Sequence, residues 1–239
     1  IKEKLILLYL RDMHAPTWIS LFINPFYFVR KDLYTHIKDI APNITGRTLD
    51  IGCGSKPYKS LYKSSEYVGL EFDTPENRRI KNADYFYNGN TFPFNEDDFD
   101  SVVASEVFEH IFNPDNFLDE IHRTLKKDGK LFMTIPFIWD EHEQPFDYAR
   151  YSSYGIKAIL EKHGFEILDQ RKSVDDIRVI FQLMNLYILN KLRTNSGLLN
   201  QLMILVLIAP LNIFGSLINL ILPSNSELYL DNIILARKV

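Results

Sequence analysis

The amino-acid sequence predicts an α/β domain built on a mostly parallel β-sheet with helices on both faces. Short apolar runs typical of buried strands alternate along the chain with segments that begin at helix-capping residues. One strand runs into the glycine turn 50–54, and the next strand ends in the acidic residues Glu71 and Asp73. Because ligand sites of open parallel sheets lie at the carboxyl ends of strands, the same observations predict where a ligand binds.

Length, charge and cysteine content narrow the class of protein. The chain has 239 residues, enough for one α/β domain with additions, and we expect a single domain over 1–239. A formal net charge of −4 gives no basic footprint, which argues against nucleic acid as a partner. The single cysteine, Cys53, allows no internal disulfide and favours a reducing, cytoplasmic compartment. Charged residues separate the apolar stretches 5–10 and 18–28, and no small-residue cleavage site follows, so we expect no signal peptide.

Capping residues and apolar runs define the expected elements in chain order. The expected helices start at Asn24-Pro25, Asn113-Pro114 and Ser152 or Ser153, and end near residues 40, 126 and 163. Gly164 supplies a left-handed turn after the last helix, and Asp128-Gly129 supplies a turn into a strand. The expected strands cover residues 48–51, 67–70, 100–104, 130–135, 165–168 and 228–236.

The glycine turn is suited to the close approach of a ligand. Gly52 and Gly54 have no Cβ, so the backbone can turn sharply there and a ligand can come near it. Glu71 ends the next strand at the same edge, where a carboxylate can accept hydrogen bonds from two ribose hydroxyls. Lys56-Pro57 replaces the last glycine of the dinucleotide fingerprint, which argues against a pyrophosphate cofactor such as NAD. A nucleoside site is therefore favoured over its alternative, an ordinary tight turn.

The motifs occur in the order of a known enzyme family. Leu49-Asp50-Ile51-Gly52-Cys53-Gly54 resembles the first motif of the class I S-adenosylmethionine-dependent methyltransferases of the type 11 kind, and Tyr67-Val68-Gly69-Leu70-Glu71 resembles their second. Further matches are Phe92-Pro93-Phe94, Phe99-Asp100, Glu109-His110, Glu120-Ile121-His122-Arg123, Leu125-Lys126 and Gly129. The resemblance covers about Thr48 to Ile167, half of the chain. It implies a Rossmann-like, seven-stranded sheet and S-adenosyl-L-methionine as cofactor.

The resemblance also implies which residues hold the cofactor. Gly52 and Gly54 would approach its methionine part, Asp50 would anchor the turn or the ammonium group, and Glu71 would hold the ribose. Asn88 stands where many relatives carry an aspartate that accepts from the adenine amino group. Ser105 and Glu106 would line the cofactor and the methyl group, or would instead cap a helix. The full expected set is Asp50, Gly52, Cys53, Gly54, Glu71, Phe72, Asn88, Gly89, Ser105 and Glu106.

Methyl transfer needs an aligned acceptor and, for a hydroxyl, a group that takes its proton. His110 follows Glu109 just beyond the strand 100–104, and histidine titrates near neutral pH, which makes His110 a candidate base. Its alternative roles are packing on the cofactor or capping the next helix.

The connection after the strand 130–135 is rich in ionisable and aromatic residues. Its His-x-x-Pro-x-Asp-x-x-Arg pattern resembles one branch of these enzymes, often associated with bacterial surface-polysaccharide synthesis. In that branch His142 would be the base or would orient the acceptor, Asp147 would be its partner, and Arg150 would clamp a hydroxylated or anionic group. The alternative is a solvated loop with a salt bridge. No metal is expected, because His142 and Asp147 lack a third ligand at a regular spacing.

A stretch of 33 residues, 194–226, contains no charged residue. We expect two apolar helices that break near Pro210, inserted between the last two strands. They could form an internal cap, a homodimer face, an acceptor tunnel or a contact with one membrane leaflet, which the preceding basic residues of 171–193 would favour. The expected division is a helical extension over 1–46, a cofactor-binding core over 47–173, an apolar helical insertion over 174–226 and the last strand within 227–239.

These observations predict an enzyme that methylates a hydroxyl of a glycan or lipid-linked sugar at the inner face of the membrane. Two alternatives are a methyltransferase for a hydrophobic, quinone-like small molecule, and a non-catalytic scaffold that binds the cofactor at the membrane.

Overall fold

The structure is a computed structural model that describes residues 12–239. The chain forms two compact units, one from the residues up to His36 together with 172–230, and one from 37–171 together with 231–239. The expected apolar stretch 5–10 lies outside the described residues. The division into an extension, a core and an insertion stays a prediction.

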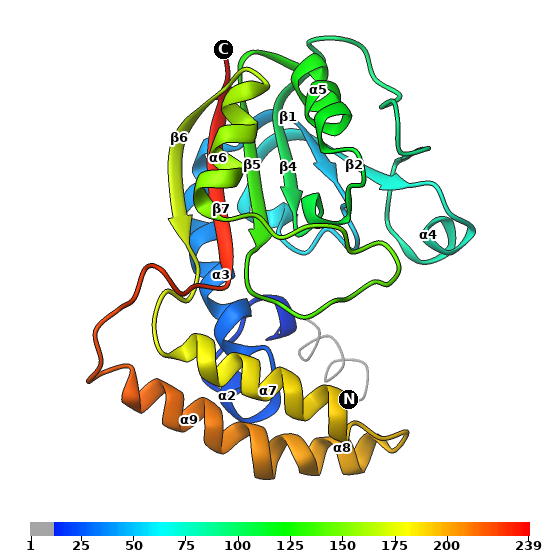
Figure 1. Ribbon diagram of the computed structural model, residues 1–239. Helices are drawn as coiled ribbons and strands as arrows, with labels where there is room; N and C mark the ends of the chain where they lie inside the picture. Colours follow the sequence, from blue (N-terminus) through cyan, green and yellow to red (C-terminus); the bar gives the residue numbers. More distant parts are fainter. Residues whose placement is uncertain (1–11) are drawn as a thin grey trace. The chain divides into compact units, whose positions relative to one another are not determined.

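The second unit, which we call the sheet unit, contains a seven-stranded sheet with the order β3-β2-β1-β4-β5-β7-β6 (Figure 1). The strands are β1 (Thr45–Ile51), β2 (Lys63–Phe72), β3 (Tyr85–Tyr87), β4 (Phe99–Ser105), β5 (Leu125–Pro136), β6 (Phe165–Lys172) and β7 (Asp231–Lys238). The pairs among β1 to β5 are parallel, and β7 runs antiparallel to β5. The Rossmann-like, mostly parallel sheet expected from the sequence is confirmed.

The helices of the sheet unit are α4 (Pro75–Ile80), α5 (Pro114–Thr124) and α6 (Ser153–Lys162), with the short 3-10 helices η1 (Ala41–Asn43), η2 (Lys59–Leu61) and η3 (Phe108–His110). Helices α5 and α6 bury their apolar sides, whereas α4 has no buried residue. Leu118 of α5 and Leu160 of α6 are fully buried in the same cluster as Leu49 of β1 and Val102 of β4. Apolar burial of this kind stabilises the sheet and leaves the strand ends free to carry a site.

Local signals set most element boundaries. The Asn113 side chain accepts a hydrogen bond from the Asn116 amide and caps α5, and Ser152, rather than Ser153, caps α6. Gly164 has the expected left-handed conformation, with φ of 77°. The last strand begins at residue 231 instead of 228. Helix α5 ends at 124 instead of 126 because β5 begins directly afterwards, and residues 126–129 form an irregularity in its pairing with β4.

The first unit, which we call the helical unit, contains the uncharged stretch 194–226 and the elements on either side of it. They are α2 (Ser20–Ile23), most of α3 (Tyr27–Ile40), α7 (Arg178–Leu192), α8 (Gly197–Met203), the π-helical segment η4 (Ile204–Ile208) and α9 (Ala209–Ile218). The expected break near Pro210 is wrong: residues 197–218 form one continuous helix. Pro210 lies in the first turn of α9, directly after the π-helical segment, where a missing amide hydrogen bond is tolerated. The interruption falls instead between α7 and α8, where Ser196 caps α8.

Polar and small residues that interrupt the apolar pattern of α9 have contacts inside the helical unit. The Asn212 amide accepts a hydrogen bond from Asn185 Nδ2 at 2.8 Å and donates to the Leu21 carbonyl at 3.0 Å. A Cβ on Gly215 would lie 2.8 Å from the Phe181 ring, so this position requires glycine. These residues fix how α9 packs within its unit, because a buried amide is costly unless it is hydrogen-bonded.

Candidate active site

The glycine turn after β1 places two glycines in different surroundings. Both have left-handed backbones, with φ of 65° at Gly52 and 52° at Gly54. A Cβ on Gly52 would lie 2.4 Å from a methyl carbon of Val107, so this glycine allows the turn to pack on the segment after β4. Among the described residues, no atom lies within 4 Å of the corresponding position on Gly54. Gly54 is thus the glycine of the pair that borders open space.

Glu71 lies directly beside this turn. Its Oε1 accepts a hydrogen bond from the Gly54 amide at 2.6 Å, and its side chain is 6% exposed. β2 is the parallel neighbour of β1, which explains why the end of β2 meets the turn after β1. The carboxylate and the turn that the sequence singled out are therefore one structural feature.

Asp50 is buried beneath the same turn. The Tyr67 hydroxyl donates to Asp50 Oδ2 at 2.7 Å. Burial raises the pKa of Asp50 to about 7 although the Tyr67 hydroxyl stabilises its charged form. Cys53 is also buried, and burial raises the pKa of its thiol to about 12, so Cys53 is not a nucleophile at neutral pH.

Lys56 has a role that sequence reasoning missed, because Lys56-Pro57 was interpreted only as a departure from a glycine motif. The Lys56 ammonium is 2.6 Å from Asp84 Oδ2, and the same oxygen accepts from the Gly69 amide at 2.7 Å. A Cβ on Gly69 would lie 2.5 Å from Lys56 Cε. Lys56 therefore ties the glycine turn to β2 and to the residue before β3.

Phe72, Asn88 and Gly89 meet near the ends of β2 and β3. The Phe72 ring is 42% exposed and lies edge-on to Tyr87, with centroids 6.1 Å apart. A Cβ on Gly89 would lie 3.0 Å from that ring. Asn88 Oδ1 already accepts from the Asn90 amide at 3.1 Å, so its expected bond to adenine would have to share this oxygen. The adenine role of Asn88 stays a prediction.

Ser105 is the last residue of β4, and Glu106 follows it at the same sheet edge. Ser105 Oγ is buried and has no hydrogen-bond partner among the described residues. Glu106 has φ of 55°, and its amide donates to the Thr134 carbonyl at 2.9 Å. The short helix η3 begins after Val107 and has no side-chain cap, so the capping alternative for these two residues does not apply to it.

The structure brings His110 and His142 together, which their 32-residue separation did not reveal. Their ring centroids are 4.7 Å apart. The Nε2 atoms of His110 and His142 lie 3.6 and 3.9 Å from Oε1 of Glu109, whose side chain is fully buried. Burial raises the pKa of Glu109 well above its usual range, and the nearby negative charge of Glu106 raises it further. We call these three residues the His–Glu cluster.

Backbone hydrogen bonds hold the loop 137–152 against η3. The amides of Tyr148 and Ala149 donate to the Glu109 carbonyl at 2.9 and 3.2 Å. Asp147 accepts two hydrogen bonds from the Arg150 guanidinium, and its Oδ2 accepts from the His142 amide at 2.9 Å. The bond to Arg150 lowers the pKa of Asp147 to about 2. Asp147 therefore orients His142, while Arg150 holds Asp147 as well as bordering the cluster.

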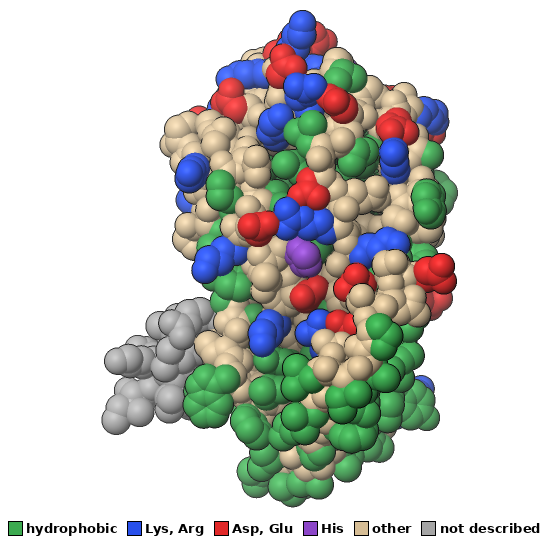
Figure 2. All heavy atoms as spheres, turned by 90° about the vertical axis from the view of Figure 1, so that its left-hand side faces the viewer, with side chains coloured by type: hydrophobic (Ala, Val, Ile, Leu, Met, Phe, Trp, Pro, Cys, Tyr) green, Lys and Arg blue, Asp and Glu red, His purple; other side chains and the backbone are tan. Residues whose placement is uncertain are grey.

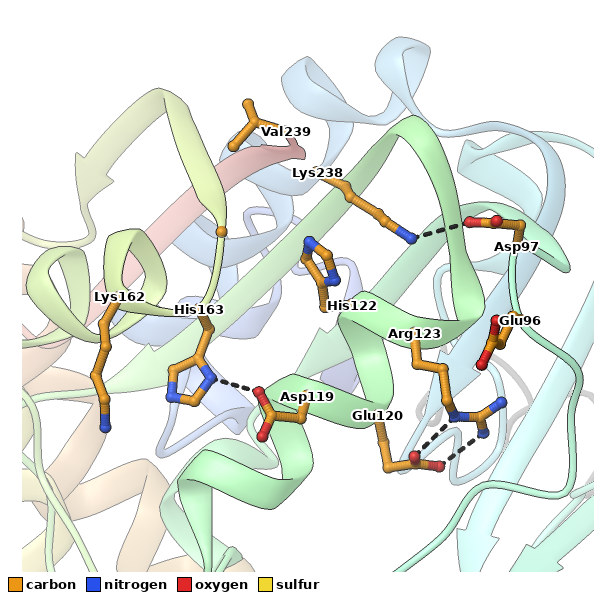
Figure 3. Close-up of a pocket in the computed structure, with 11 residues that line it drawn as sticks. Glu96, Asp97, Asp119, Glu120, His122, Arg123, Lys162, His163, Lys238 and Val239 are labelled. Carbon is orange, nitrogen blue, oxygen red and sulfur yellow. Dashed lines mark hydrogen bonds and ion pairs between the residues drawn. The ribbon is translucent and has the colours of Figure 1, made fainter.

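A depression at the opposite ends of the strands from the glycine turn is lined by paired charged residues (Figure 3). It is lined by residues from the end of α5, the end of α6 and the loop before β4. Lys238 pairs with Asp97, Arg123 with Glu120, and His163 with Asp119. These residues lie at the amino ends of the parallel strands, away from the glycine turn, so the depression does not belong to the candidate site.

Comparisons with known proteins agree with this geometry. Residues 49–133 match the family model described as a methyltransferase domain. An uncharacterized protein of Methanocaldococcus jannaschii is 27% identical over 126 residues, covering 50% of this chain and 54% of that protein. A mitochondrial ubiquinone biosynthesis O-methyltransferase of Dictyostelium discoideum is 30% identical over 108 residues, covering 36% of this chain and 34% of that protein. The chain thus spans about half or less of the length of these relatives.

Solved structures show the same fold. The cyclase SpnF has a TM-score of 0.55 and 18% identity, with 89% of this chain and 83% of that chain covered. A Haemonchus contortus phosphoethanolamine N-methyltransferase 2 in complex with S-adenosyl-L-methionine has a TM-score of 0.54 and 17% identity, with 95% and 58% covered. A cyclase and a methyltransferase on one fold show that the chemistry must be argued from the site.

The sheet order and the glycine turn joined to Glu71 define an α/β protein of the Rossmann-like class. Within that class, residues 49–133 match the methyltransferase-domain model, and the Haemonchus contortus enzyme that shares the fold was solved with S-adenosyl-L-methionine bound. Gly54, which faces open space beside Glu71, fits a cofactor that approaches the backbone. The individual roles of the cofactor-binding residues stay predictions.

Proposed function

We propose that the protein transfers a methyl group from S-adenosyl-L-methionine to a hydroxyl of a glycan or lipid-linked sugar. One observation carries the proposal: the His–Glu cluster and the glycine turn share one edge of the sheet. β4 and β1 are parallel neighbours, and Val107, between Ser105 and the cluster, contacts the position of Gly52. A hydroxyl held by His110 or His142 would therefore lie near the donor methyl, and the cluster would assist its deprotonation.

The loop 137–152 and the segment before α5 provide an aromatic rim beside the cluster. Phe112 and Tyr148 are 82% and 44% exposed and lie edge to face, with centroids 5.2 Å apart. Phe146, whose carbonyl contacts His110 Nδ1, is 53% exposed. Exposed rings of this kind offer faces on which a sugar ring can pack while its hydroxyl reaches the histidines.

The same rim would also accept an apolar ring, and this supports a quinone-like acceptor as the second candidate. The Dictyostelium discoideum relative that matches about a third of the chain is a ubiquinone biosynthesis O-methyltransferase. A methyl-transfer assay that offers the full-length protein a water-soluble sugar, a lipid-linked sugar and a catechol separates the candidates. Methylation of a sugar with a mass increase of one methyl group supports the first; methylation of the catechol alone supports the second; methylation of none contradicts both.

We also propose that the helical unit contacts the inner leaflet of a membrane. In the described part of the chain, one helix, 197–218, is long and apolar enough to cross a membrane. Only 28% of its most apolar 18-residue segment is buried. Figure 2 shows hydrophobic side chains gathered over the helical unit. Within residues 197–221, the exposed apolar side chains include Leu198, Leu199, Leu202, Leu205, Val206, Phe214, Leu217, Leu220 and Ile221. A surface this apolar favours a lipid interface over water.

Several basic residues of 171–193 are paired. Arg171 pairs with Asp39 and Asp169, Arg178 pairs with Asp176, and Lys172 donates to the Ser226 carbonyl, whereas Lys191 and Arg193 at the end of α7 are exposed. Binding should therefore depend on apolar contact more than on anionic lipid. Sedimentation with liposomes tests this: Leu205→Ser with Phe214→Ser should reduce the bound fraction, whereas equal binding of this variant and the native chain would contradict the proposal.

A further inference from the structure

Glu109 is a buried carboxylate that is attracted by the charge of Arg150 but accepts no hydrogen bond in the described part of the chain. Its side chain is 0% exposed, and neither carboxylate oxygen has a hydrogen-bond partner among the described residues. An ionised carboxylate in such surroundings is costly unless a cation or several donors compensate it. Glu109 therefore needs either a proton or a cation next to its oxygens.

The two histidines of the cluster present their ring nitrogens to Glu109 in a defined way. His110 Nδ1 is 2.8 Å from the Phe146 carbonyl oxygen, which can only accept, so Nδ1 carries the hydrogen. His142 Nδ1 faces two acceptors, Asp147 Oδ2 and the Asp140 carbonyl oxygen, each at 3.3 Å. In each neutral imidazole the Nε2 lone pair is consequently free to bind a ligand, and both Nε2 atoms face the same carboxylate.

We infer that Glu109, His110 and His142 bind one divalent cation of the zinc type. Two imidazoles and one carboxylate are a ligand set of protein zinc sites that leaves a coordination position open. The three ligand atoms lie within 4.8 Å of one another, and ligands around bound zinc lie roughly 3.3 Å apart. Small side-chain rotations would close that difference.

The groups behind the histidines match those of metal sites. A metal-bound histidine usually donates its other ring nitrogen to a carbonyl or a carboxylate, which fixes the ring orientation. The Phe146 carbonyl serves His110 in this way, and the Asp140 carbonyl serves His142, with the Asp147 carboxylate at the same distance from the ring nitrogen. The expectation of no metal rested on spacing along the chain, and spacing does not reveal a site whose third ligand is 32 residues away.

The cation would give the cluster its chemical role. This role rests on the proposed function. An acceptor hydroxyl bound at the open position would give up its proton to solvent water more readily, because a bound divalent cation stabilises the alkoxide that remains to take the methyl group. In that account the histidines are ligands and not proton acceptors. The competing account is a protonated Glu109 that shares its hydrogen with the histidines, in which case the cluster binds no metal.

Titration of Zn²⁺ into the chelator-treated full-length protein, followed by calorimetry, tests the inference without cofactor or acceptor. We expect one Zn²⁺ per chain, a more than tenfold weaker affinity in Glu109→Gln and in His142→Ala, and about 10-fold to 100-fold weaker binding in Asp147→Asn. Co²⁺ substitution should add visible absorption bands in the native chain that both ligand variants lose. His163→Ala is the matched control, because His163 also contacts two carboxylates but with separate ring nitrogens.

Two results would overturn the inference: no stoichiometric Zn²⁺ binding by the native chain, or equal binding by the native chain and both ligand variants. Circular dichroism of each variant shows whether a loss of binding reflects unfolding. Should either ligand variant unfold, the ring nitrogens of His110 and His142 in the native chain give the second readout, since Zn²⁺ must shift both Nε2 resonances. Methyl transfer is measured separately, so a protein that binds Zn²⁺ but methylates no acceptor contradicts the proposed function and leaves the metal site supported.

Discussion

The two sides of the candidate active site are built in different ways. On the cofactor side, Gly54 and Glu71 belong to consecutive strand ends, and one hydrogen bond joins them. On the acceptor side, His142 reaches His110 only because the loop 137–152 returns to η3 through backbone bonds to the Glu109 carbonyl. The first side depends on the sheet, whereas the second depends on a loop. Changes on one side should therefore leave the other side working.

The largest expected effect is on the acceptor side. His142→Ala should lower the rate of methyl transfer by about 100-fold to 10,000-fold, because it removes a group that activates the acceptor hydroxyl. The affinity for S-adenosylhomocysteine, measured by calorimetry, should change by less than about twofold. A parallel loss of cofactor affinity and rate would show that the two sides are not separate. Tyr154→Ala is the control, since that side chain is 84% exposed on α6.

The two glycines of the turn provide the next comparison. Gly52→Ala should destabilise the fold by roughly 2–4 kcal/mol, because a Cβ in a left-handed backbone would also collide with Val107. Gly54→Ala should cost only about 1–2 kcal/mol of stability, from the left-handed backbone alone, and should weaken cofactor binding at least tenfold. Thermal unfolding and calorimetry measure the two effects. Equal destabilisation by both substitutions would contradict the assignment.

A smaller effect concerns the pH dependence of stability. The pKa of Asp50 is about 7 in the folded chain and near 3.8 when unfolded, so the folded state binds the proton more tightly. The stabilisation is complete below about pH 4 and is lost as pH rises through about 7. Asp50→Asn keeps an acceptor for the Tyr67 hydroxyl and should flatten the decline of the melting temperature between pH 5 and 8. An unchanged slope would show that Asp50 titrates normally.

The meeting of Gly54 and Glu71 at one sheet edge was predictable from sequence, whereas the arrangement of the histidines was predictable only in part. Glycine turns, helix caps and acidic strand ends depend on residues that are close in sequence. The local pattern was therefore enough to predict the positions of Gly54, Glu71, Asn113 and Ser152 in these elements. The contact between His110 and His142 depends on tertiary contacts of the loop 137–152, and no local sequence pattern predicts these contacts. The continuous helix through Pro210 was missed for a similar reason, because a π-helical turn before a proline removes the conflict that proline normally creates.

The central claim is that the edge formed by Gly54 and Glu71 binds S-adenosyl-L-methionine. Calorimetric titration of S-adenosylhomocysteine into the full-length protein tests it most directly, with NAD as the comparison ligand. We predict one site for S-adenosylhomocysteine, no binding of NAD, and at least a tenfold loss of affinity in Glu71→Gln, with Asp73→Asn unchanged because Asp73 is exposed and pairs with Arg78. Binding that is absent in the native chain, or equally tight in Glu71→Gln, would contradict the account.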